Sequence, residues 1–110
     1  MLNEADFRDR AEDAIEQLEE KLLPIADQHE FEVEAAEGIL TILFEEPSPT
    51  KFIVSPNSPA RQIWVSALST SYKFGWDDAT NGFVLDKTHE PFFHVIANLV
   101  SRHLGKPVQL

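Results

Sequence analysis

The chain has 110 residues, no cysteine and a formal net charge of −10, with 43% hydrophobic residues. This length suits one compact domain with its own core, and the missing cysteine excludes disulfides and thiolate-held metal or iron–sulfur sites. The negative charge argues against nucleic acid or an anionic membrane as a direct partner. No apolar run approaches the roughly 20 residues of a membrane span, and the acidic start lacks the pattern of a targeting peptide, so we expect a cytoplasmic protein.

The first third of the chain predicts an acidic amphipathic helix. Apolar residues repeat at helical spacing from Phe7 to Leu22, and Asn3 is a suitable N-cap. Pro24 is expected to end or kink the helix, which we therefore place at residues 3–23. Thirteen of the nineteen carboxylates lie in the first 37 residues, against three basic residues, so the negative charge is concentrated in one part of the chain.

The middle of the chain predicts a series of short antiparallel strands. Apolar and acidic residues alternate over residues 31–35, so that the acids of this strand point away from the core. A turn at Gly38 leads into a second strand, and the proline-containing residues 45–50 form a connection. Further strands are predicted around residues 52–54, 62–68, 72–76 and 83–86, with a turn bracketed by Pro56 and Pro59 before the second of these.

A second helix is predicted near the end of the chain. Apolar residues return to helical spacing between Phe92 and Leu104, with Pro91 near the first turn and Gly105 just past the end. Both amphipathic helices must bury one face, and the sheet between them offers the available surface. The chain is therefore expected to form one α+β domain over residues 1–110, a two-layer sandwich in which both helices cover one face of an antiparallel sheet of about five or six strands.

Carboxylates gather on the solvent side of the first helix at spacings of three and four residues, so they lie side by side and repel one another. Oxygen ligands on a rigid element suit divalent cations such as Fe²⁺, Mn²⁺, Ca²⁺ or Mg²⁺, bound weakly because no loop wraps the ion. A solvated acidic face that keeps the protein soluble is the alternative. The candidate ligands on the helix are Glu12, Asp13, Glu16, Glu19 and Glu20, here called the acidic ridge, and the acids continue onto Glu30, Glu32 and Glu34.

One tryptophan lies on the polar side of a predicted central strand. Alternation over residues 62–67 places Trp64 between Gln62 and Ser66, opposite the small apolar row. A sheet face open to solvent should carry no large aromatic residue. Because tryptophan is enriched at interface hot spots, Trp64 is a candidate anchor for a partner; packing beneath a loop or tail is the alternative.

The sequence contains Pro59, Gln62, Ile63 and Trp64, followed by Tyr72 and Phe74. In this spacing it resembles the PxxQ(V/I)W…YxF pattern of the frataxin family, in its bacterial form. The order and spacing of the predicted elements are similar from about residue 5 to residue 105. The resemblance implies an iron-binding regulator or iron-delivery protein in iron–sulfur cluster assembly, with weakly bound Fe²⁺ or Fe³⁺. It implies iron contacts at Glu12, Glu19, Glu20, Glu30, Glu32 and Glu34.

The resemblance also implies that the acidic ridge and the sheet face around Trp64 dock onto a cysteine desulfurase and its scaffold protein. The candidate partner contacts are Ser55, Asn57, Gln62 and Trp64. The family usually has Asn and Gln where this chain has Ser55 and Asn57, and bacterial relatives often carry acids where it has Leu23 and Pro24. We therefore expect altered partner contacts and fewer or more weakly held ions. A monomer is expected, with iron-dependent oligomers as the alternative.

The sequence contains no motif that indicates catalysis. A Ser-His-Asp order, a glycine-rich phosphate loop and an HExxH motif are all missing, so we predict that the protein is not an enzyme. Two alternatives stay open beside the iron-binding regulator: an acidic protein-interaction module without a metal role, and an enzyme that oxidises iron.

Overall fold

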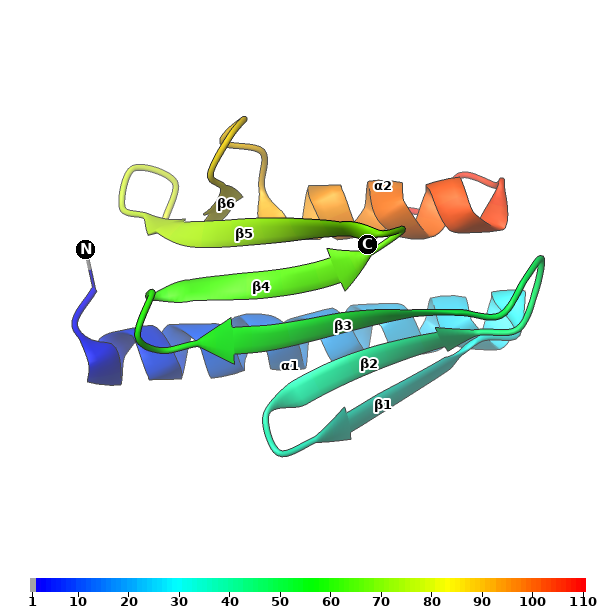
Figure 1. Ribbon diagram of the computed structural model, residues 1–110, viewed down its shortest axis with the longest axis horizontal. Coiled ribbons are helices and arrows are strands. Elements are labelled where there is room, and N and C mark those ends of the chain that lie inside the picture. Colours follow the sequence, from blue (N-terminus) through cyan, green and yellow to red (C-terminus); the bar gives the residue numbers. More distant parts are fainter. Residues whose placement is uncertain (1) are drawn as a thin grey trace.

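The computed structural model describes residues 2–110 and shows two helices and a six-stranded sheet (Figure 1). The strands are antiparallel and neighbour one another in chain order, which makes the sheet a simple meander. The predicted α+β sandwich is confirmed. In chain order the elements are α1 (Glu4–His29), β1 (Glu32–Ala36), β2 (Ile39–Phe44), β3 (Thr50–Asn57), β4 (Gln62–Ala67), β5 (Thr70–Asp77), β6 (Gly82–Leu85) and α2 (Phe92–Leu104).

Both helices cover the same face of the sheet, as predicted. Figure 1 looks onto the open face, with α1 passing behind β3. Burial alternates along the strands, so that β4 buries Ile63, Val65 and Ala67 towards the helices and turns its other residues to solvent. The apolar stripes of the two helices close the core from the other side. Neither helix within residues 2–110 is long and apolar enough to cross a membrane.

The first helix is longer than the sequence indicates. Asn3 caps it as predicted, since its Oδ1 accepts a hydrogen bond from the Asp6 N–H at 2.8 Å, but the helix continues through Pro24 to His29. The predicted end at Pro24 is wrong. Pro24 is exposed, so water can reach the carbonyl that loses its helical donor, while Leu22 and Ala26 stay buried on the sheet on either side of it.

The third strand is also longer than predicted, and it contains Pro56, which was expected in a turn. Pro56 lies opposite Ile63 of β4 but beyond Val54, the last β3 residue paired with β2. The missing N–H therefore falls where β3 has no β2 partner. The β3–β4 turn begins after Asn57, whose Oδ1 accepts a hydrogen bond from the Ala60 N–H at 3.0 Å.

The C-terminal tail folds back onto α2. Gly105 ends this helix with a φ of 69°, in the left-handed region that favours glycine. The Ser101 hydroxyl donates to the Ala97 carbonyl at 2.7 Å and accepts the Val108 N–H at 2.9 Å. Val108 and Leu110 pack against the core, so the tail is part of the folded domain.

Candidate functional site

Part of the acidic ridge forms one wall of a groove beside the sheet. Glu12, Glu16 and Glu19 of α1 face the β1–β2 turn and the end of β3 across a space of about 610 Å³. Glu37, in that turn, adds a fourth carboxylate from the opposite side. Arg8 is a basic residue of the lining, and most of the remaining lining residues are apolar, so this groove combines hydrophobic side chains with four carboxylates and one guanidinium. The apolar lining residues are Ile15, Ala35, Ala36, Ile39 and Pro56.

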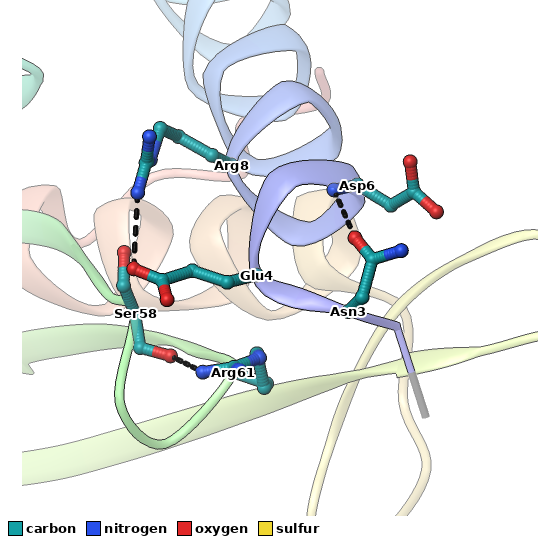
Figure 2. A network of polar contacts seen from close by, with 6 residues as sticks. All are labelled: Asn3, Glu4, Asp6, Arg8, Ser58 and Arg61. Atoms are coloured by element: carbon teal, nitrogen blue, oxygen red, sulfur yellow. Dashed lines mark hydrogen bonds and ion pairs between the residues drawn. The ribbon is translucent and has the colours of Figure 1, made fainter.

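The basic residues near the ridge contact groups other than the ridge carboxylates, although Arg8 also lines the groove. Arg8 pairs with Glu4 at 3.0 Å, one turn before the ridge begins. Figure 2 shows this pair beside the β3–β4 turn, where the Arg61 side chain donates to the Ser58 carbonyl. The Arg10 guanidinium lies 5.0 Å from the Trp76 ring centre, and the Lys21 ammonium lies 5.3 Å from that of Phe93. Within residues 2–110 the ridge carboxylates therefore form no ion pair.

The structure does not bring the eight candidate metal ligands together. Asp13 lines the separate groove between α1 and α2. Glu30 is the C-cap of α1, with a φ of 57°, and lies before β1, which begins at Glu32. By the helical rise, it lies roughly 27 Å along the axis from Glu12. Glu32 and Glu34 are exposed on β1 and point away from the helix layer, because they alternate with the inward-facing Val33.

These carboxylates form an open row. Among residues 2–110, no three His, Cys, Asp or Glu side chains approach closely enough to hold a metal ion together. A divalent cation on such a row would take one or two protein oxygens and keep most of its water. The arrangement can concentrate cations and attract a basic surface, since exposed like charges on one rigid helix add their fields.

The second candidate surface is the open face of the sheet around Trp64. Trp64 is 38% exposed, so it is not covered by a loop or tail. It lies in β4, the fourth of six strands, with Ser55 directly opposite on β3 and Lys73 on β5. Asn57 lies opposite Gln62 in the next row. The four predicted partner contacts therefore share one face.

The two surfaces meet at the end of β3. Pro56 lines the acidic groove, and its neighbours Ser55 and Asn57 lie on the open face beside Trp64 and Gln62. The carbonyl oxygen of the Asn57 side chain is already bonded within the turn. A partner that covers this corner of the molecule would contact both surfaces.

A polar network that was not predicted from the sequence holds the indole. The Trp64 Nε1–H donates to Gln62 Oε1 at 2.9 Å, and Gln62 Nε2 donates to Asp86 Oδ2 at 2.6 Å. The Lys73 ammonium lies over the ring, 5.1 Å from its centre. The alternation of β5 places Lys73 on the face of Trp64, but the hairpin register was needed to pair them. Asp86 is 24 residues from Gln62, and no local pattern indicates their contact.

Comparison with known proteins agrees with this architecture. The family model described as "Frataxin-like domain" matches residues 1–106. The chain is 30% identical to the iron-sulfur cluster assembly protein CyaY of Pseudomonas fluorescens (strain Pf0-1), covering 94% of this chain and 91% of the relative. It is 32% identical to the protein of the same name from Pseudomonas aeruginosa, covering 98% and 96%.

A solved structure shares the fold. The frataxin from Psychromonas ingrahamii superposes with a TM-score of 0.80 at 18% identity, over 98% of this chain and 97% of the other. The fold therefore agrees over nearly the whole chain. The match of the family model, together with relatives that are 30% and 32% identical over nearly the whole chain, shows that the chain belongs to the family of frataxin-like domains.

Proposed function

We propose that this protein is a non-catalytic, cytoplasmic accessory protein of iron–sulfur cluster assembly. The observation that carries the proposal is the match over nearly the whole chain to relatives named iron-sulfur cluster assembly protein. The geometry supports a binding role, because the most distinctive surfaces are an acidic groove and an exposed indole that meet at one corner. The proposed partners are a cysteine desulfurase and its scaffold protein.

The electrostatics of the acidic ridge favour a basic partner. Its carboxylates have no ion pairs within residues 2–110, so a row of Lys or Arg on a partner could pair with them without breaking internal contacts. Such complementarity raises the rate of association and makes it sensitive to salt. The apolar residues of the groove and the indole would supply the buried contacts that hold the complex.

Iron is proposed as cargo or signal, held weakly at the ridge. Hard carboxylate oxygens suit Fe²⁺ and other divalent cations, but each ion would have few protein ligands. A second candidate function, an acidic interaction module without a metal role, is favoured by one observation: no three of the acids in residues 2–110 converge. Replacing Glu12 and Glu16 by Gln separates the two. A metal role requires that the loss of docking depend on Fe²⁺, whereas a pure interaction module loses docking equally with and without Fe²⁺.

The proposal is tested by capture of a purified desulfurase and scaffold on the immobilised protein. Wild type should retain them, and Trp64→Ala should not. The double variant Glu12→Gln/Glu16→Gln should weaken capture most at low salt, whereas Glu45→Gln/Glu46→Gln, in the exposed β2–β3 connection, removes the same charge elsewhere and should bind like wild type. Failure of wild type to bind either protein would refute the proposal, and repeated turnover of Fe²⁺ under oxygen would refute its non-catalytic part.

A further inference from the structure

Two consecutive hydrogen bonds hold the indole of Trp64, and the donor and acceptor in each of them are fixed by chemistry. The indole N–H can only donate, and the carboxylate of Asp86 can only accept. Gln62 lies between them and satisfies both, with its carbonyl oxygen towards Trp64 at 2.9 Å and its amide nitrogen towards Asp86 at 2.6 Å. The Trp64 donor and the Asp86 acceptor therefore set the orientation of the Gln62 amide between them.

A glycine in β5 leaves room for the Asp86 side chain to reach Gln62. Asp86 follows β6, two residues after Val84, which is paired with Gly75 of β5. Gly75 in turn is directly opposite Gln62 of β4, so the Asp86 side chain reaches Gln62 by passing over Gly75. A Cβ atom at Gly75 would lie 3.4 Å from Asp86 Oδ1, already in van der Waals contact, so a branched side chain at this position would crowd the carboxylate. The Asp86 N–H also donates to the Lys73 carbonyl at 3.0 Å, which fixes the backbone of Asp86 to β5. Glycine inside a strand commonly marks such a close approach.

From this geometry we infer that Asp86 is a positioning residue for the partner-binding surface: through Gln62 it locks the Trp64 indole in place with its N–H already satisfied. Lys73 lies over the ring and restrains it further. A partner would then meet the exposed part of an indole held in a fixed orientation and would gain no hydrogen bond from its N–H. The locking follows from the contacts alone, whereas its effect on binding rests on the proposed function.

The test uses Asp86→Ala and Asp86→Asn in the full chain. Asn keeps an acceptor oxygen and should preserve the lock, whereas Ala removes it. The readout is the ¹⁵N relaxation of the two indole N–H groups. The Trp64 signal should shift and become more mobile in Asp86→Ala and stay close to wild type in Asp86→Asn. Trp76, whose N–H donates to Asp78, is the internal control and should not change.

Gly75→Val provides a second route to the same result. This change keeps Asp86, Gln62 and Trp64 in the sequence but crowds the Asp86 carboxylate, so it should make the Trp64 indole mobile as Asp86→Ala does. Melting curves confirm that each variant is folded. The inference would be overturned if ¹⁵N relaxation showed that the Trp64 indole N–H is as ordered in both Asp86→Ala and Gly75→Val as it is in the wild-type protein.

Affinity for the desulfurase and scaffold tests the consequence. Freeing one side chain that must be ordered again on binding should weaken affinity by about 2- to 10-fold in Asp86→Ala and leave Asp86→Asn near wild type. Unchanged affinity in Asp86→Ala with a mobile indole would overturn the role of the lock in binding. Absence of binding by wild type would instead refute the proposed function, and the relaxation data would still decide whether Asp86 holds the indole.

Discussion

Replacing Glu16 by Gln should stabilise the protein, because Glu16 lies at the centre of the acidic ridge. The four carboxylates one turn away on either side of it are Glu12, Asp13, Glu19 and Glu20. Each like-charge pair at these spacings costs about 0.2–0.5 kcal/mol, so removing four gives a gain of about 1–2 kcal/mol at low ionic strength. The helix propensities of Glu and Gln are similar and add little.

The assay is thermal and chemical unfolding at low and high salt. A gain of about 1 kcal/mol corresponds to a rise in melting temperature of roughly 3–6 °C for a domain of this size. At 1 M salt the screening length is about 3 Å, so the gain should largely vanish. Glu45→Gln, which removes one charge from an exposed connection, is the matched control and should change stability little. The reasoning fails if Glu16→Gln behaves like this control, or if its gain persists at 1 M salt.

Three further predictions concern the fold. Glu37→Asn should raise the free energy of unfolding by about 0.5–1 kcal/mol in chemical denaturation, because Glu37 and Gly38 have φ values of 54° and 81° and Asn-Gly suits such a turn; a loss of stability would contradict this. Ser101→Ala should cost about 1–2 kcal/mol and speed hydrogen exchange at the Val108 amide, and unchanged exchange would show that the tail is held otherwise. Phe74→Ala, at a fully buried position, should cost about 3–5 kcal/mol in the same assay, and a cost below about 1 kcal/mol would contradict its place in the core.

Most of the fold could be predicted because hydrophobic periodicity reports burial directly. The alternation of β4 and the helical stripe of α2 appear in the structure as expected. The two errors at prolines have a common cause. Pro24 and Pro56 each break a local rule, but each lies where its missing N–H leaves no buried group unpaired. Such tolerance depends on tertiary surroundings, which the local sequence does not contain.

Some features of the candidate site could likewise be predicted from local spacing, and others depend on how the elements pack. The exposure of Trp64 follows from strand alternation, and the row of carboxylates on α1 follows from helical spacing. The grouping of Glu37 with that row required knowledge of where the β1–β2 turn lies relative to α1. The contact of Asp86 with Gln62 required the complete strand order. Exposure and spacing within one element could be predicted, whereas residue contacts that depend on strand order and register could not.

The most direct test of the proposed role is the rate of iron–sulfur cluster formation on a purified scaffold with its desulfurase, followed by absorbance. Adding this protein in equimolar amount should change that rate, and the change should be lost in a variant that combines Trp64→Ala with Glu12→Gln and Glu16→Gln. Glu45→Gln/Glu46→Gln should act like wild type. A rate unaffected by the wild-type protein would contradict the account.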